Sequence, residues 1–317
     1  MDRVEVVVTG VGMVTPLGTT ARATADAWRA GRAAERRPLP DLAGTPLAGA
    51  SVAVPPAFDA AERLGGRKMI KYMSDAAVLG CVAAREAVEA AGLRSRFRPE
   101  RVGLYAGTGL AAPPLHDLLP LLRASLDETG SFSCRRLGSQ GLAAANPLWS
   151  FKILANMPPC LVSILEGVKG PSLIFSPWEG QTAAALVEAW RAVAAGEVDA
   201  ALAGAADSAA HPTTLITLWQ AGLLHEPDVP ASAAAYIVLE RAETARRDGR
   251  PAVARVAGLE TTAADSPADD PLASRMGRSF AASPAVLLAL AALTAPVTVA
   301  LQGSDGRAFR ATLETAA

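Results

Sequence analysis

Residues 172–206, SLIFSPWEGQTAAALVEAWRAVAAGEVDAALAGAA, contain the most regular pattern in the chain. The pattern predicts a strand at Ser172–Ser176 and a helix at Gly180–Ala195. A second predicted strand follows at Asp199–Ala203, with a turn expected at Gly204. Because strand, helix and strand alternate here, this stretch predicts a layered α/β fold.

The same alternation extends towards both ends of the chain. The β-branched run Val4–Thr9 predicts a strand that ends in a tight turn at Gly10-Val11-Gly12. Arg101–Ala106 predicts another strand, which leads into a loop at Gly107-Thr108-Gly109. Further helices are expected at Thr20–Ala30 and Ser74–Ala91, and further strands at Ala233–Glu240, Ala252–Thr261, Val297–Leu301 and Arg307–Leu313. Buried strands separated by helices favour a parallel or mixed sheet.

The composition places the chain in the globular class. It has 317 residues, of which 50% are hydrophobic and 19% are charged, and its formal net charge is −1. A near-neutral chain has no global field that would hold a phosphate backbone, which argues against nucleic acid as a partner. The three cysteines show no CxxC spacing, and the first residues lack the basic segment of a signal peptide. We therefore expect a cytoplasmic protein.

One uncharged stretch, Phe280–Leu301, is long enough to cross a bilayer. Pro284 and Pro296 divide it into a short Ala/Leu-rich helix and the β-branched run Val297–Leu301. A helix of that length is normally a core element of a globular protein. We therefore expect a buried helix followed by a strand, and no membrane partner.

The common cofactor and catalytic motifs are incomplete or missing. Gly10-Val11-Gly12 lacks the third glycine of a dinucleotide-binding fingerprint, because that position holds Thr15. Gly138-Ser139-Gln140-Gly141 lacks the spacing of a serine-hydrolase elbow. The spacing of metal ligands is also absent from the three histidines, His116, His211 and His225. We therefore expect no cofactor and no bound metal.

Several segments together resemble the β-ketoacyl synthase family, whose members share the duplicated thiolase-type fold. Val7–Gly18 resembles the opening strand and turn of that family. Asn156-Met157-Pro158, followed by Lys169-Gly170-Pro171-Ser172, resembles the stretch that leads to the nucleophile strand. Ala189–Ala206 is similar to the helix and strand that come after the nucleophile.

The resemblance implies an α/β fold with thiolase-like αβαβα layers, built from two related halves. Residues 1–225 would form the N-terminal ketosynthase-like half, and residues 226–317 a shortened C-terminal half. Arg278–Leu293 resembles the helix that follows the family's second histidine motif, and Leu301–Leu313 resembles the closing glycine-rich hairpin. The catalytic loops that lie between these segments in the family are therefore expected to be deleted.

Two departures from the family decide what the resemblance implies about function. Ungapped counts from Gly170-Pro171 and from Ala189 both place the nucleophilic cysteine of the family at Glu179. The family's two catalytic histidines lie in the C-terminal half, whereas the last histidine of this chain is His225. A carboxylate is a poor acyl carrier and cannot replace a low-pKa thiol in thioester exchange. We therefore expect a non-catalytic homologue without catalytic residues of its own.

The known non-catalytic class of this family is the chain-length factor of type II polyketide synthases. The resemblance implies a heterodimer with an active ketosynthase, docking of an acyl carrier protein, and a tunnel for the growing chain. It leaves the product class and the chain length open. Leu110–Leu122 matches the tunnel-lining region, where the candidates are Pro113, His116 and Pro120. The candidate dimer-interface residues are Asn156, Met157, Ser172, Ile174 and Ser176.

Two other functions stay open at this point. One is a decarboxylase of ketosynthase type that acts on malonyl carrier protein, although such relatives retain their histidines. The other is a homodimeric acyl-binding protein, which needs only the fold.

Finally, a short basic cluster predicts a solvated loop that could contact an acidic carrier protein. Its members are Arg94, Arg96, Arg98 and Arg101.

Overall fold

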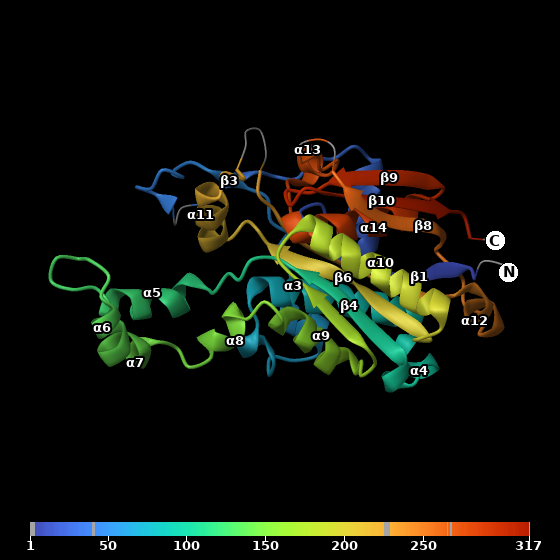
Figure 1. Cartoon of the computed structure of the whole chain (residues 1–317), viewed down its shortest axis with the longest axis horizontal. Coiled ribbons are helices and arrows are strands. Elements are labelled where there is room, and N and C mark those ends of the chain that lie inside the picture. The colour runs from blue at the N-terminus through green and yellow to red at the C-terminus, as the bar shows by residue number, and fades with distance from the viewer. Residues whose placement is uncertain (1–3, 40–41, 225–228, 265, 267, 317) are drawn as a thin grey trace.

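The computed structural model describes residues 4–39, 42–224, 229–264, 266 and 268–316 (Figure 1). Its main feature is an eight-stranded sheet in the order β5-β4-β6-β7-β1-β8-β10-β9. The strands are β1 (Val6–Val14), β4 (Val102–Thr108), β5 (Ser172–Phe175), β6 (Ala200–Ser208), β7 (Ser232–Arg241), β8 (Ala254–Ala263), β9 (Val297–Gln302) and β10 (Arg307–Glu314). A separate hairpin pairs β2 (Arg37–Pro38) with β3 (Ser51–Val52).

Most helices are short, and the longest described ones cover the sheet. The helices of two turns or more are α1 (Ala21–Arg29), α3 (Asp75–Ala91), α5 (Leu115–Ala124), α9 (Met157–Glu166), α10 (Glu179–Ala195), α11 (Pro212–Gln220) and α14 (Ser283–Thr294). The shorter helices are α2 (Ala60–Leu64), η2 (Ile70–Tyr72), α4 (Leu93–Arg96), η3 (Pro99–Arg101), α6 (Cys134–Arg136), η4 (Leu137–Gly141), α7 (Leu142–Ala144), α8 (Trp149–Ile153), α12 (Ala242–Arg247), α13 (Ala273–Met276) and η5 (Phe280–Ala282).

The first five strands of the sheet come mainly from the N-terminal part of the chain. β4 is parallel to β5 and β6, whereas β7 runs antiparallel to β6 and β1. The sheet is therefore mixed. The expected boundary between residues 225 and 226, like His225 itself, lies outside the described residues. β7 comes after that boundary, but it completes the sheet formed by the strands before it.

The molecule is layered around this sheet, as Figure 1 shows. α3 and α9 pack on one face, where they share an apolar core with β4, β6 and β7. α10 and α14 pack on the other face. The strands β8, β10 and β9 then cover α10 and α14 from the opposite side. The two central helices are therefore enclosed between strands, which excludes water from both of their sides.

The C-terminal strands turn a polar face outwards. Cross-strand neighbours on β8 and β10 include Arg310 with Glu260, and Thr298 on β9 faces Thr312 on β10. Among the described residues, the helices that pack closely against these three strands are α10 and α14, which lie on the inner side. The described residues after β7 thus supply the strands β8, β9 and β10 and the central helix α14.

The structure corrects the expected turn at Gly10-Val11-Gly12, because β1 continues through these residues. Packing explains the glycines instead: a Cβ on Gly12 would lie 2.0 Å from the carbonyl oxygen of Ala83 in α3. Gly204 was expected in a turn but lies inside β6, against the ring of Tyr236. Each of these glycines permits a close approach between layers rather than a change of chain direction.

Other expected elements are found close to the expected positions. α3 begins after the N-cap Ser74 and ends at Gly92, which adopts the left-handed conformation. The loop expected at Gly107-Thr108-Gly109 starts later, because β4 extends to Thr108. The uncharged stretch forms α14 and β9. Within the described part of the chain, no helix combines the length and apolar character required to span a bilayer.

Replacement of Gly12 by alanine is expected to lower the free energy of unfolding by about 2 kcal/mol or more. The new Cβ would force β1 and α3 apart at Ala83. The matched control is Gly258→Ala in β8, where no atom lies within 4 Å of an added Cβ. The free energy of unfolding of that variant is expected to stay within about 0.5 kcal/mol of the parent value. Urea denaturation measures both, and equal stabilities of the two variants would contradict the packing explanation.

Candidate functional site

Glu179 is the first residue of α10 and is fully buried. Its Oε1 atom accepts hydrogen bonds from Arg278 Nη2 at 2.9 Å and from Ser304 Oγ at 3.1 Å. Its Oε2 atom accepts a hydrogen bond from the backbone nitrogen of Ser304 at 3.2 Å. The start of a helix favours a negative charge. Both carboxylate oxygens are therefore committed to partners inside the protein.

Arg278 brings the compensating positive charge and is 3% exposed. Its Nη2 atom also donates to Ser304 Oγ at 2.7 Å, and its guanidinium lies 4.6 Å from the ring centre of Phe280. Phe280 has a φ of 37°, a left-handed conformation that is unusual for a bulky residue. Arg278, Ser304 and Glu179 thus form one buried polar cluster, which we call the Glu179 cluster.

The turn between β9 and β10 closes this cluster from the C-terminal part of the chain. Asp305 Oδ1 accepts a hydrogen bond from the backbone nitrogen of Gly180 at 3.2 Å. A Cβ on Gly303 would lie 2.9 Å from the Cβ of Glu179, so the turn needs glycine at that position. The beginning of α10 is therefore held directly under this turn.

Two further acids are buried near the cluster. Burial raises the pKa of Asp207 well above its ordinary value, and the nearby charge of Glu179 adds to this effect. Asp207 Oδ2 accepts a hydrogen bond from the backbone nitrogen of Ala281 at 3.1 Å. Burial also raises the pKa of Asp270 to about 6, although hydrogen bonds from Ser283 and from the backbone of Leu272 act to lower this pKa. Burial therefore favours the neutral form of Asp207.

The three cysteines belong to helices other than α10. Cys81 is buried in α3, and burial raises its pKa to about 12, which makes its thiol unreactive. Cys134 belongs to α6, and Cys160 belongs to α9. In the described ranges, no group of three or more His, Cys, Asp or Glu side chains is arranged to hold a metal ion.

The tunnel candidates lie along the start of α5 and not beside Glu179. Pro113 is buried in the loop before the helix. His116 is exposed in the first turn, with its Nε2 atom 3.7 Å from Asp117 Oδ1. Pro120 lies inside α5 and is exposed. Their role in a tunnel stays a prediction.

The interface candidates gather at one edge of the sheet. Ser172 and Ile174 lie on β5. Among the described strands, β5 pairs only with β4, so its other edge is open to the described part of the chain. Asn156 is exposed just before α9, and Met157 is half-buried at its first position. Ser176 is half-buried and donates to the carbonyl oxygen of Gly109 at 3.4 Å.

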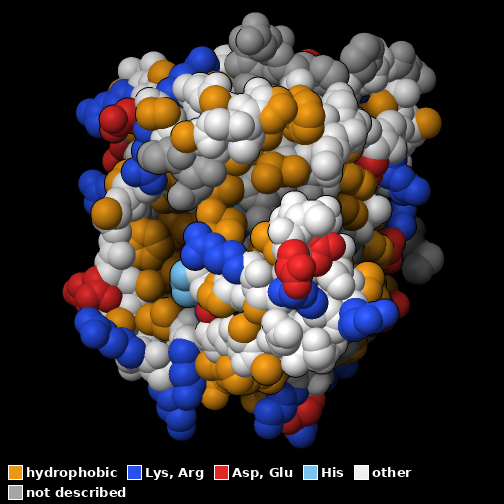
Figure 2. Space-filling model, turned by 90° about the vertical axis from the view of Figure 1, so that its left-hand side faces the viewer, with side chains coloured by type: hydrophobic (Ala, Val, Ile, Leu, Met, Phe, Trp, Pro, Cys, Tyr) orange, Lys and Arg blue, Asp and Glu red, His pale blue; other side chains and the backbone are white. Residues whose placement is uncertain are grey.

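Apolar side chains are exposed along the same side of the molecule. α5, α6 and α7 project away from the sheet (Figure 1), and hydrophobic side chains are spread over this end (Figure 2). A buried ion pair of 2.6 Å between Asp117 and Lys152 ties α5 to α8. We call residues 110–156 the arm. The exposed apolar residues of the arm, α9 and β5 are Leu119, Leu126, Phe132, Leu142, Phe151, Leu154, Ile164, Leu173 and Ile174.

The sequence analysis missed Arg278 as the partner of Glu179. The place of Arg278 in the sequence could have pointed to it, because Arg278 begins the segment that resembles the helix after the family's second histidine motif. The basic cluster of Arg94, Arg96, Arg98 and Arg101 was expected to be solvated. Arg94 and Arg98 are exposed, as expected. Arg94 and Arg101 also form ion pairs, with Glu166 and Asp199, while their side chains stay 45% and 41% exposed. Only Arg96 is largely buried, in an ion pair with Glu240.

Glu179→Gln is expected to lower the free energy of unfolding by about 3–5 kcal/mol, because it breaks the buried ion pair between Glu179 and Arg278. The matched control is Glu188→Gln, which breaks an exposed ion pair with Arg191 on the same helix. That change is expected to cost less than about 1 kcal/mol.

Chemical denaturation measures both variants and the double variant E179Q/R278Q. The double variant is expected to lose less stability than the sum of the two single changes. Strict additivity would show that the two side chains do not depend on each other.

Comparisons with known proteins identify the family and the fold of the chain. The model of the β-ketoacyl synthase N-terminal domain matches residues 3–245. The 3-oxoacyl-[acyl-carrier-protein] synthase 2 of Vibrio cholerae is 26% identical over 213 residues, which are 67% of this chain and 48% of that protein. The chain thus spans about half the length of this curated relative.

Two solved structures share the fold. One is AntDE:AntF, a type II PKS acyl-carrier protein in complex with its ketosynthase bound to the hexaketide (TM-score 0.78, 18% identity). The other is the ishigamide ketosynthase/chain length factor (TM-score 0.79, 18% identity). In both, the similarity covers 99% of this chain and 100% of the other chain. They confirm the thiolase-like layered α/β fold. Since the family model matches well over half of the chain, this protein belongs to the β-ketoacyl synthase family.

Proposed function

We propose that this chain is a non-catalytic, chain-length-factor-like subunit that pairs with an active ketosynthase. The observation that carries the proposal is the Glu179 cluster. Thioester exchange needs a thiolate at the start of the helix, where a helix dipole lowers the pKa of a cysteine. Here that position is expected at Glu179, whose two oxygens accept hydrogen bonds from Arg278 and Ser304. A carboxylate held in this way has no free oxygen for nucleophilic or base catalysis.

The solved structures with this fold support the same function. This chain covers 100% of a chain in each of the two structures above. One of those structures is described as a ketosynthase/chain length factor, so a factor of this kind is our preferred model. The shortened C-terminal part also agrees with a subunit that leaves the chemistry to its partner.

The partner would cover the open edge of β5 and the exposed apolar side chains beside it. An unpaired strand edge offers a row of backbone donors and acceptors to a second strand. Leu173 and Ile174 are 42% and 37% exposed on this short strand, and Ile164 of α9 is 63% exposed. Obligate interfaces bury about 2,000 Å² or more and are apolar. In this arrangement the arm would reach over the partner, and Pro113, His116 and Pro120 would line the tunnel.

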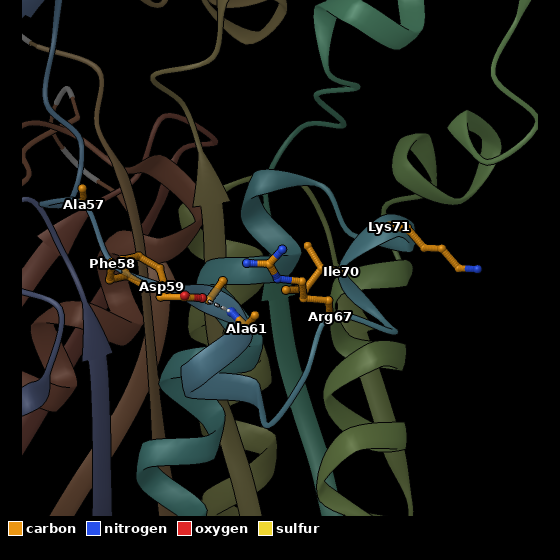
Figure 3. A pocket seen from close by; sticks show the side chains of 8 residues that line it. Ala57, Phe58, Asp59, Ala61, Arg67, Ile70 and Lys71 are labelled. Carbon is orange, nitrogen blue, oxygen red and sulfur yellow. Dashed lines mark hydrogen bonds between the residues drawn. The ribbon is translucent and has the colours of Figure 1, made fainter.

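An open pocket of about 820 Å³ offers a docking position for the carrier protein (Figure 3). Its cations are Arg67 and Lys71, and its apolar walls include Phe58 and Ile70. Asp59 also borders it, but its carboxylate accepts hydrogen bonds from the first turn of α2. Carrier proteins are acidic, so exposed cations beside an apolar wall would attract them. The arginines of the other basic cluster are instead largely engaged in ion pairs.

The two alternative functions predict different behaviour of the purified chain. A malonyl-carrier-protein decarboxylase would turn over its substrate without a partner. A homodimeric acyl-binding protein would purify as a dimer of this chain alone. The subunit proposal requires a second, different chain.

Purification of the tagged chain from its own host is expected to yield one stoichiometric ketosynthase that has a nucleophilic cysteine and two histidines. Ile174→Glu places a charge on the open edge of β5 and is expected to remove this partner. The matched control is Val253→Glu, because Val253 is 36% exposed, almost as much as Ile174, but lies far along the sheet beside β8. Native mass spectrometry measures the composition of each sample. A homodimer or a monomer without a ketosynthase would refute the proposal.

Lys71→Glu is expected to weaken binding of the holo carrier protein to the complex by about fivefold, because it reverses one rim charge. The effect should shrink at high salt, where charges are screened. Arg22→Glu is the control, since Arg22 is a 93% exposed cation on α1. Titration calorimetry at two salt concentrations measures the affinities. Equal losses in the two variants would mean that the carrier does not dock at this pocket.

A further inference from the structure

The helices α5, α6, η4 and α7 form a unit that projects from the rest of the molecule (Figure 1). We call residues 115–144 the projecting unit. Its helices pack on one another. Two segments without helix or strand structure, residues 109–114 and 145–148, connect it to β4 and to α8. Segments of this kind can act as hinges, because they absorb changes in backbone angles without breaking a helix or a strand.

The interior of the projecting unit is small. The buried residues of its four helices, all of which the structure describes, are Asp117, Leu121 and Gly141. None of the apolar clusters formed by described residues includes a residue of this unit. The burial of apolar side chains therefore contributes little to holding the unit against the sheet.

A buried polar cluster connects the projecting unit to the next helix instead. Asp117 of α5 is 2% exposed, and its Oδ2 atom accepts a hydrogen bond from Lys152 Nζ at 2.6 Å. Its Oδ1 atom accepts a hydrogen bond from Asn146 Nδ2 at 2.5 Å. Lys152 belongs to α8 and is also buried. We call the contact between Asp117 and Lys152 the latch.

α8 itself is fixed to the rest of the molecule on its other side. The ring of Phe151 meets the ring of Tyr72 in η2 edge-on, with 5.6 Å between the ring centres. α8 also packs against α9, which covers the sheet. The latch therefore joins the projecting unit to a helix that is held in place independently of that unit.

The space beside the start of α5 is not filled by side chains. A cavity of about 690 Å³ lies there, with Leu115 and His116 on one side and Leu39 and Val54 on another. Figure 2 shows a hollow on this side of the molecule. A displacement of α5 at this place would therefore not break a packed core.

We propose that the projecting unit opens away from the rest of the molecule as one piece while the sheet stays folded, and that the latch keeps it closed. An ion pair suits this task, because opening returns both charges to water and so offsets part of their lost attraction. Closure requires the one geometry in which Lys152 reaches Asp117. The unit is thus held in a defined position by a contact that can be released.

This inference does not rest on the proposed subunit function, since every contact that it uses lies within one chain. The two are nevertheless connected through the tunnel candidates. His116 and Pro120 belong to the projecting unit, and Pro113 belongs to the segment before it. An opening of the unit would therefore move these candidates together.

The test is hydrogen exchange, read by mass spectrometry on the protein as it is purified, with any co-purifying subunit retained. In the parent, amides of residues 115–144 are expected to exchange faster than those of β6 and α10. Lys152→Met breaks the latch and leaves Asp117 buried without this counter-ion, which favours the open state. Exchange in residues 115–144 is expected to rise at least about 30-fold. Exchange in β6 and α10 is expected to change less than about twofold, because the sheet stays folded.

Two further variants separate the latch from general damage. Arg136→Met removes an exposed partner of Glu128 within the same unit and is expected to change exchange there less than about threefold. The double variant D117L/K152M replaces both buried charges by apolar side chains and is expected to return exchange to within about tenfold of the parent. The proposal is overturned if Lys152→Met leaves exchange in residues 115–144 unchanged, if it speeds exchange in β6 and α10 equally, or if Arg136→Met has the same effect.

Discussion

The buried ion pair between Glu179 and Arg278 is the constraint on which the centre of the molecule depends. It joins the start of α10 to the segment that leads into α14, and Ser304 adds the turn between β9 and β10. Two charges removed from water stabilise a fold only when each has its partner. The pair therefore fixes how the C-terminal strands sit over the central helices.

Much of the fold could be predicted from local patterns. Ser74 and Gly92 mark the ends of α3 because a cap and a left-handed glycine act within one turn. Gly12 misled the prediction, since the reason for its glycine is a carbonyl group of α3 more than 70 residues away in sequence. Arg278 was missed for the same reason: its partner is 99 positions away, and only the folded chain brings them together. Glu179 could be singled out from the sequence because the resemblance to the family, and not a local pattern, drew attention to its position.

The composition of α14 explains why its sequence alone was compatible with both a membrane span and a core helix. α14 lies between strands, with its residues from Ser283 to Ala292 all buried, so it carries no polar face. A helix that is apolar all round belongs either to a lipid bilayer or to the middle of a layered protein. Because α14 has 12 residues and strand β9 follows it, α14 belongs to the middle of a layered protein. Small alanine side chains let the two strand layers approach it from both sides.

The open edge of β5 and the apolar arm have a consequence for how a cell must make this protein. An unpaired strand beside exposed leucine, isoleucine and phenylalanine side chains is a template for aggregation when it stays uncovered. A copy synthesised in excess of whatever covers this surface would be lost to precipitation or to proteases. If the proposed partner chain covers this surface, selection should favour matched synthesis of the two chains, for instance by translational coupling, so that the vulnerable surface exists only briefly after each ribosome finishes.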